Sequence, residues 1–390
     1  MLELDTTTVD MFVRSKPSIR TLGQQLDTRL ARLLSALGQS EHLENSLRIV
    51  RLLTSSWRDE VVSAGPRWSS DITDDHSPFE FSLALDGNSE VLRILTEPQD
   101  LEQPSLRASW RLAAAIHDEL ATKWGAGFAG YDKVAALFEP TDTDEGVFSI
   151  WHSAILGKAK KNEFKVYLNP AIHGAADAER LVSEALGRLG LGKAWQALSK
   201  IALARGGLDQ VIYFSLDLAD AAGARAKVYV AHRHATASDV ARALSHCPGF
   251  GLHGIGRWCQ HLLGSGGPFH DRPPITCFAL RRAELDLYTT TLHLPVRCYA
   301  PDDFDIARRI CTLLRFPQRV SYMRALTELA ERPLESGPGL QTYASLRASP
   351  GREAITVYLA PQVYLPARVR DELRGSFFSS SAASTRGLSI

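Results

Sequence analysis

Apolar and polar residues alternate along five paired segments of this chain. The pairs lie at residues 79–98, 148–170, 211–232, 275–296 and 340–361. Apolar residues at every second position are typical of a β-strand that turns one face toward a core. In the first pair, Asp86-Gly87 separates the two halves, and this dipeptide is a strong turn signal. The pattern therefore predicts five antiparallel β-hairpins.

Helical patterns, with apolar residues at i, i+3 and i+4, fill the intervals between the hairpins. The clearest lie at 105–124, 177–203, 237–247 and 304–316, and a further helical region at about 20–60 precedes the first hairpin. The chain therefore repeats a unit in which a helical part is followed by a hairpin.

One residue on the second strand of each hairpin marks the period of this repeat. These residues are Arg93, Lys165, Lys227, His293 and Tyr358, and successive ones are 62 to 72 residues apart. Five antiparallel hairpins leave exposed strand edges unless the sheet closes on itself. We therefore expect an α+β fold in which ten antiparallel strands form a barrel inside a ring of helices.

The alternation also predicts which face of each strand points inward. In "KVYL", "AKVYV" and "TVYLAP" the valines and leucines share one face, which we expect against the helices. The other face carries Lys, Tyr, Arg and Thr and would line the interior. Because a ten-stranded barrel is too wide for side chains to fill, we expect a polar, solvent-filled lumen.

The helix-hairpin rhythm continues without a dividing linker. We therefore expect one domain over residues 1–374. The tail at 375–390, "GSFFSSSAASTRGLSI", is rich in small polar residues and is expected to be disordered.

Composition and charge narrow the function. The chain has 390 residues, of which 45% are hydrophobic and 23% charged, as in an ordinary globular protein. Its 44 basic and 44 acidic residues give a net charge of +0, which argues against nucleic acid as a partner. Residues 1–20 resemble no secretory signal, and no apolar run is long enough to span a membrane. The five cysteines have no CxxC spacing, so we expect reduced thiols and a cytoplasmic location.

Four cations share the predicted inner face, namely Arg93, Lys165, Arg225 and Lys227. In a confined space they would form a pyrophosphate site, because Arg and Lys donate charge-assisted hydrogen bonds to its oxygens. Taken singly, each is more often a solvent-facing strand residue without a ligand, because Lys and Arg are mostly exposed. Their recurrence in phase favours the anion site for the set.

Tyrosines and one glutamate share that face. Tyr167, Tyr229, Tyr343 and Tyr358 could shelter a carbocation through the ring quadrupole, although tyrosines also pack laterally in ordinary strands. Glu80 lies opposite in phase to Phe79 and Phe81, and its carboxylate could accept a hydrogen bond from a substrate N–H or act as a general base. A lone glutamate at a strand start is more often solvated.

These segments resemble a known family. The ordered set "PFEFSLAL…VLRILTEP", "KVYLNP", "RAKVYV" and "TYASLR…AITVYLAP" resembles the aromatic prenyltransferases of the dimethylallyltryptophan synthase type over residues 57–365. That family has the ABBA, or PT-barrel, fold, with ten antiparallel strands around a solvent-filled lumen. The shortness of the chain is more similar to the bacterial indole prenyltransferases than to the fungal members.

The resemblance implies a role for each inner residue. Glu80 matches the glutamate that binds the indole N–H, and the four cations match those that hold the donor diphosphate. The four tyrosines match residues that shield the allyl cation and reach the diphosphate. His293 or Thr291 stands where fungal members have a further tyrosine. His152 is the nearest inward candidate for the catalytic base, which is commonly a lysine in fungal members.

The implied activity is transfer of a dimethylallyl group from dimethylallyl diphosphate to the indole of tryptophan, in secondary metabolism. The alternative is prenylation, with a dimethylallyl or a geranyl group, of a tryptophan-derived metabolite such as an indolactam or a cyclic dipeptide. A non-catalytic barrel that binds an isoprenyl diphosphate or other small anion would explain the cations but leaves Glu80 without a role. A phenol or naphthalene prenyltransferase typically lacks this glutamate.

The sequence contains no DDxxD box, in keeping with a family that needs no magnesium, and no hydrolase motif such as GxSxG or HExxH. We therefore expect no cofactor or metal. The expected partners are small-molecule substrates, and the expected assembly is a monomer or a homodimer.

Overall fold

The computed structural model describes residues 21–364, except 64, 88, 145, 158–161, 220–223, 246, 248–251, 282–285 and 350–351. The tail at 375–390, for which the sequence predicts disorder, lies outside the described residues, as do residues 1–20.

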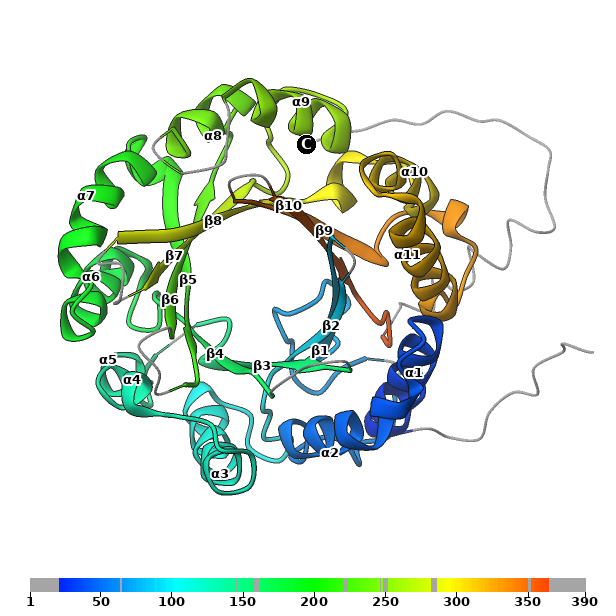
Figure 1. Ribbon diagram of the computed structural model, residues 1–390. Helices are drawn as coiled ribbons and strands as arrows, with labels where there is room; N and C mark the ends of the chain where they lie inside the picture. The colour runs from blue at the N-terminus through cyan, green and yellow to red at the C-terminus, as the bar shows by residue number, and fades with distance from the viewer. Residues whose placement is uncertain are drawn as a thin grey trace, which may run out of the picture.

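Ten antiparallel strands form a closed barrel, as the sequence predicts (Figure 1). They are β1 Phe79–Asp86, β2 Ser89–Thr96, β3 Ile150–Leu156, β4 Phe164–Leu168, β5 Asp209–Asp217, β6 Arg225–His232, β7 Ile275–Arg281, β8 Asp286–Leu294, β9 Gln341–Ser349 and β10 Arg352–Leu359. Every strand pairs with its neighbours in the sequence, and β1 pairs with β10 to close the sheet. Closure leaves no free edge.

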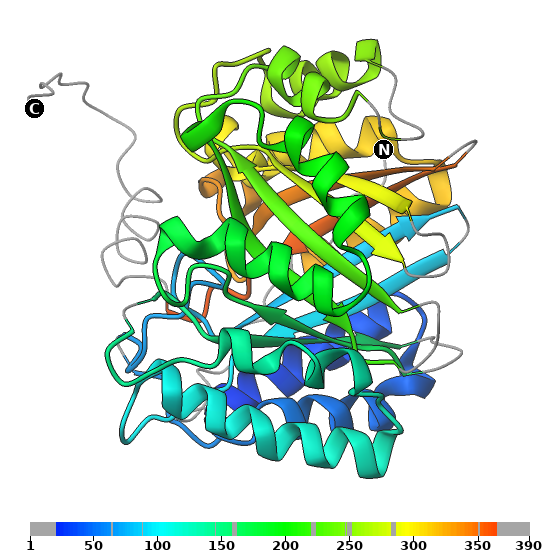
Figure 2. The same cartoon turned by 90° about the vertical axis from the view of Figure 1, so that its left-hand side faces the viewer.

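Helices surround this barrel on the outside (Figures 1 and 2). They are α1 Leu22–Ala36, α2 Leu43–Leu53, α3 Leu106–Trp124, the short α4 Ala129–Asp132 and α5 Ala135–Phe138, α6 Ala178–Arg188, α7 Gly192–Ala202, α8 Ala237–Ala243, α9 Leu252–Leu263, α10 Asp303–Leu313 and α11 Phe316–Leu329. Within the described ranges, no helix is long and apolar enough to cross a membrane.

The predicted helix at 177–203 is interrupted. Gly190 has a φ of 77°, which favours glycine, and the chain divides there into α6 and α7. The helix predicted at 105–124 agrees closely with α3. Ser105 caps its first turn by accepting a hydrogen bond from the Ala108 amide, and Gly125 ends it in the left-handed conformation. Helices α9 and α11 were not singled out by the sequence pattern.

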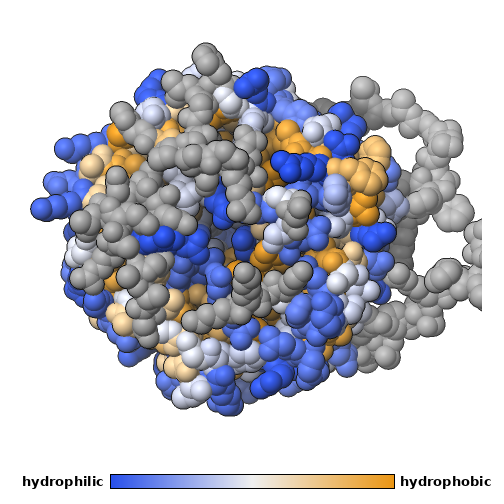
Figure 3. Space-filling view, viewed as in Figure 1, coloured by the Kyte–Doolittle hydropathy of each residue, from blue (hydrophilic) through white to orange (hydrophobic). Residues whose placement is uncertain are grey.

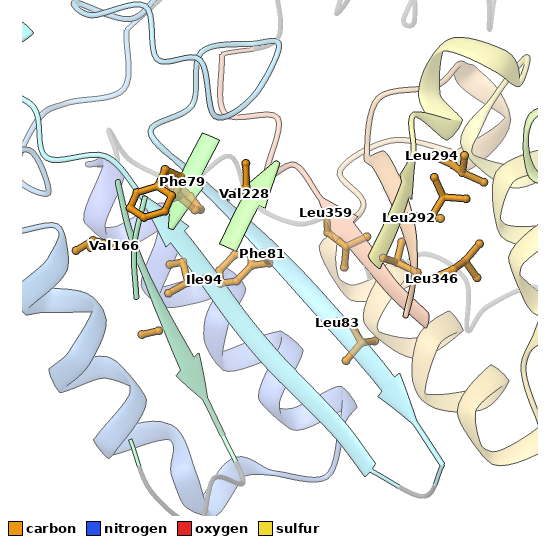
Figure 4. Packing of buried hydrophobic residues seen from close by; sticks show 14 of the residues in the cluster. Phe79, Phe81, Leu83, Ile94, Val166, Val228, Leu292, Leu294, Leu346 and Leu359 are labelled. Carbon is orange, nitrogen blue, oxygen red and sulfur yellow. The ribbon is translucent and has the colours of Figure 1, made fainter. Parts of the chain in front are cut away.

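The core lies between the barrel and the helices, rather than inside the barrel. Phe79, Phe81 and Leu83 on β1 are fully buried in the main hydrophobic cluster (Figure 4). Leucines of α1 belong to the same cluster. Fully burying such a side chain contributes about 1.5–3 kcal/mol. The same strand turns Glu80 and Ser82 toward the interior. Because the outer face supplies the apolar burial, the inner face is available for polar side chains.

Candidate active site

The barrel encloses a cavity of about 860 Å³. All ten strands contribute inner-face residues to its lining, together with residues of a few loops. A volume of this size suits one or two small molecules. Seen along the barrel axis, hydrophilic residues appear near the middle of the molecule as well as on its outer surface (Figure 3). The predicted polar lumen is therefore present.

The four predicted cations all line this cavity. Arg93 comes from β2, Lys165 from β4, and Arg225 and Lys227 from β6. Burial lowers the pKa of Lys165 well below its usual range, and the neighbouring Lys227 lowers it further. Burial also lowers the pKa of Lys227 and of Arg93. A bound polyanion would relieve this unfavourable crowding of positive charge.

One carboxylate offsets part of that charge. Asp217, at the end of β5, accepts a hydrogen bond from Arg225 Nε at 2.7 Å and lies 4.0 Å from Lys165 Nζ. Burial raises the pKa of Asp217, but Lys165 and Arg225 outweigh it, so the net pKa is lowered. Arg93 Nε is buried without a hydrogen-bond partner among the described residues. Arg93 therefore has a buried donor that a ligand could use.

Sequence reasoning missed Asp217 and two further cations of the lining. Arg281 lies opposite Arg225 across the β6–β7 pair, and Arg347 on β9 donates a hydrogen bond to Asp86 at 2.6 Å. All three follow the inward phase of their strands. The alternation that identified Lys227 would have identified them too.

The predicted aromatic residues meet on the same inner face. Tyr229 donates a hydrogen bond to Tyr167 at 3.3 Å between the hydroxyl oxygens. The ring of His293 lies 5.8 Å from that of Tyr229 and 5.6 Å from that of Tyr358, between centroids. Tyr343 packs against the cluster that contains Tyr229. Tyr167, Tyr229, His293 and Tyr358 line the cavity with the cations, whereas Tyr343 is not among its lining residues.

A second aromatic group was not predicted. Phe148 and Trp151 stack with their centroids 3.9 Å apart, and Tyr213 lies 5.3 Å from Trp151. Tyr213 also contacts Tyr229 in an edge-on arrangement at 5.9 Å. This group therefore contacts the predicted aromatic residues through Tyr213, and its members are not among the residues that line the cavity.

Glu80 is buried at the cavity wall, with an exposed fraction of 8%. Its Oε1 accepts a hydrogen bond from the Thr342 hydroxyl at 2.7 Å. Burial raises the pKa of Glu80 to about 8, against the opposing effects of Thr342 and Arg272. The carboxyl can therefore change its protonation state close to neutral pH.

His293 presents an imidazole to the lumen. Its Nε2 is buried and has no hydrogen-bond partner among the described residues. Burial lowers the pKa of His293 to about 3, helped by the charge of Lys227, so the ring is neutral at neutral pH. A neutral imidazole nitrogen without a partner can accept a proton.

The prediction that His152 points inward is wrong. His152 lies on β3 opposite Thr96 and Val166, and its Nε2 lies 3.0 Å from His117 Nε2 of α3. The lumen-lining residues of this strand are Ser153 and Ile155. His152 therefore belongs to the outer face, because the strand phase that carries Ile150 and Ala154 into the helix layer carries His152 with them.

Comparison with known proteins identifies a family. A family model described as tryptophan dimethylallyltransferase matches residues 39–323. A curated relative, the prenyltransferase anuH of Penicillium roqueforti, is 36% identical over 83 residues. That match covers 20% of this chain and only 18% of the relative.

Solved structures match over nearly the whole chain. The 6-dimethylallyltryptophan synthase of Micromonospora olivasterospora, solved with DMASPP and Trp, is 32% identical with a TM-score of 0.82, over 88% of this chain and 98% of that one. The 5-dimethylallyltryptophan synthase of Streptomyces coelicolor is 28% identical with a TM-score of 0.81, over 89% and 99%. AnaPT of Neosartorya fischeri, at 14% identity and a TM-score of 0.72 over 88% and 95%, shares the fold. The barrel is the ABBA prenyltransferase fold.

Proposed function

Because the chain belongs to the tryptophan dimethylallyltransferase family, we propose that it transfers a dimethylallyl group from dimethylallyl diphosphate to the indole ring of tryptophan. The observation that carries the proposal is the cavity inside the barrel, where a cation cluster, a ring of aromatic side chains and a buried carboxylate meet. Each of the three groups suits one part of this reaction.

The cation cluster suits the donor. Arg93, Lys165 and Lys227 would bind the diphosphate, together with Arg225. As the allylic C–O bond breaks, its electron pair goes to the diphosphate oxygen, and the fixed positive charges stabilise the negative charge that develops there. Because this stabilisation comes from side chains, we propose that the reaction needs no magnesium or other cofactor.

The set of aromatic side chains around the cavity suits the allyl cation. Tyr167, Tyr229 and Tyr358 present π-faces and hydroxyls around the cavity, with Tyr343 and His293 beside them. The negative face of an aromatic ring attracts a cation, and a wall of rings keeps water from adding to it. The cation then survives long enough to meet the acceptor.

The carboxylate suits the indole. Glu80 would accept a hydrogen bond from the indole N–H and increase the electron density of the ring. A pair of ring π-electrons forms the new C–C bond with the allyl cation, and the arenium then loses the proton from the alkylated carbon. We propose His293 Nε2 as the acceptor of that proton. The bound diphosphate would raise the basicity of this imidazole through its negative charge.

Other acceptors and a non-catalytic role remain distinct hypotheses. An indolactam or a cyclic dipeptide carries the same indole N–H and would use Glu80 in the same way. A barrel that only binds an isoprenyl diphosphate would not require a buried carboxylate at the cavity wall. Glu80 therefore favours an indole substrate and catalysis.

The test is an assay with dimethylallyl diphosphate and a panel of tryptophan, an indolactam, a tryptophan-containing cyclic dipeptide and a naphthol, with a chelator present. We expect a product one isoprenyl unit heavier from tryptophan. If only another indole gives a product, that compound and not tryptophan is the acceptor. Loss of activity in the presence of chelator would refute the proposal that no metal is needed. No product from any indole would refute the proposed function.

The Glu80→Gln variant tests the role of the carboxylate. We expect a fall in kcat/KM for the acceptor of about 100-fold, because a neutral amide accepts the N–H hydrogen bond less strongly. The affinity for dimethylallyl diphosphate, measured by calorimetry, should be unchanged. Equal turnover by the variant would mean that Glu80 does not act on the indole.

We further propose that the protein works in the cytoplasm as a monomer or a homodimer, with small molecules as its partners and neither nucleic acid nor membrane involved. All five cysteines, which lie within the described ranges, are free thiols, as suits a reducing compartment. Cell fractionation and size-exclusion chromatography with light scattering test both statements; a membrane-bound or larger species would contradict them.

A further inference from the structure

Strand β9 contains an irregularity at the edge of the candidate site. Its register with β10 shifts between two pairs, Ala344–Val357 and Gln341–Leu359. Two residues of β9, Thr342 and Tyr343, therefore stand opposite the single residue Tyr358. This is the arrangement of a β-bulge, which interrupts the alternation of side chains between the two faces of a strand.

The bulge turns two consecutive side chains inward. Gln341 faces outward, where it contacts Tyr322 of α11, and Ala344 also lies in the outer core. Tyr343 packs against the inner cluster that contains Tyr229. Thr342, which a regular strand would turn outward, instead reaches across β10 to donate its hydrogen bond to Glu80.

The start of β9 is held firmly in this position. Asp303 at the N-terminus of α10 is fully buried, and its carboxylate accepts hydrogen bonds from the Leu340 and Gln341 amides at 3.0 and 2.9 Å. The Gln341 side chain donates to the Asp303 carbonyl at 2.7 Å. These bonds fix the residue that precedes Thr342, so the direction of the Thr342 hydroxyl is set by α10 as well as by the sheet.

From this geometry we propose that Thr342 is a positioning residue for Glu80: its hydroxyl engages Oε1 and presents Oε2 to the N–H of the acceptor. No described residue donates a hydrogen bond to Oε2, and Glu80 lines the cavity. The proposal rests on the proposed function, because it requires an acceptor that carries an N–H.

The same bond favours the ionised form of Glu80. A hydroxyl donates to a carboxylate more strongly than to a neutral carboxyl. Thr342 accordingly opposes the rise that burial causes in the pKa of Glu80, as does the positive charge of Arg272. Only the ionised form has both oxygens available as acceptors. Without the Thr342 hydroxyl, we expect Glu80 to take up a proton at a higher pH and to bind the indole N–H less strongly.

The test compares Thr342→Val, which keeps the shape and removes the hydroxyl, with Thr342→Ser, which keeps the hydroxyl. For Thr342→Val we expect kcat/KM for tryptophan to fall about tenfold at neutral pH. The acidic limb of its pH profile should move to higher pH, so that activity recovers in alkali. Donor affinity should not change, and Thr342→Ser should keep most of the activity and the original profile.

A matched control and a double variant separate positioning from structural damage. Thr96→Val makes the same change on the outer face of β2, where the hydroxyl is buried without a partner among the described residues, and should leave the pH profile unchanged. In a Glu80→Gln background, Thr342→Val should cause little further loss. An unshifted profile for Thr342→Val, or independent losses in the double variant, would overturn the proposal. If the wild-type protein prenylates no indole, the proposed function itself fails instead.

Discussion

At the scale of single residues, the cavity is lined by ionisable groups whose pKa values are shifted by burial. Burial lowers the pKa of Lys165 and of Lys227 and raises the pKa of Glu80, in each case chiefly because water is excluded. Such opposed shifts around one cavity are typical of a catalytic site. His293 belongs to the same set, because burial leaves it neutral and able to accept a proton.

The variant His293→Phe tests the proposed base. It keeps an aromatic ring beside Tyr229 and Tyr358 but removes the nitrogen, so we expect kcat to fall about 100-fold while donor binding persists. With ring-deuterated tryptophan, a primary isotope effect should appear or increase, since proton removal becomes rate-limiting. His152→Gln is the control and should have wild-type kcat. Wild-type kcat in His293→Phe would exclude this histidine and leave the diphosphate as the alternative proton acceptor.

At the scale of elements, each strand has one face for stability and one for chemistry. A shift of a single residue in phase moves a side chain from the lumen to the helix layer. His152 illustrates this, because it packs against His117 of α3 and its Nδ1 is buried without a partner among the described residues. The pair therefore bears on the stability of the α3–β3 contact, and the lumen lies on the other side of the strand.

Because His117 and His152 are buried together, we expect the protein to lose stability in acid. Burial lowers the pKa of His117 to about 4, and burial with the nearby His117 lowers that of His152 further. In the unfolded chain both titrate near about 6.5, so below that pH the unfolded state binds more protons. We expect the free energy of unfolding to fall between about pH 7.5 and about pH 5, by roughly 1–2 kcal/mol for each histidine.

Urea unfolding at both pH values measures this effect. In His152→Gln the difference between the two conditions should shrink, because one of the two titrating groups is gone. His270→Gln, at an exposed position, is the control and should behave as the wild type does. An unchanged pH dependence in His152→Gln would show that the pair does not titrate on unfolding.

At the scale of the whole molecule, the lumen joins strands that are distant in sequence. The cations for one diphosphate come from β2, β4 and β6, in three different hairpins. A ligand that binds them together binds only the closed barrel, since the unfolded chain does not assemble the set. Ligand binding and barrel closure are therefore linked.

Inorganic pyrophosphate should consequently stabilise the fold. At a concentration of 100 times its Kd, we expect a gain of about 2.7 kcal/mol, seen as a higher Tm in thermal unfolding. Lys165→Met should reduce the gain, whereas Lys200→Met, at an exposed position on α7, should not. Equal stabilisation of all three proteins would indicate that pyrophosphate binds elsewhere.

The sequence by itself determined the barrel and most of its inner face. The period of two within strands and the recurrence of helix and hairpin are local properties, because side-chain direction follows from the backbone and not from distant partners. Arg93, Lys165, Arg225, Lys227 and Glu80 were therefore found by phase, and all line the cavity. The tyrosines on the same phase meet beside them.

Only the tertiary structure decided the features that depend on register between strands. The outward position of His152 follows from the pairing of β3 with β2 and β4, and the inward position of Thr342 from a bulge that exists only against β10. The ionisation of Glu80 and His293 likewise depends on how completely the closed barrel excludes water. Register, bulges and burial arise from contacts between segments far apart in the chain. A local sequence pattern therefore cannot predict them.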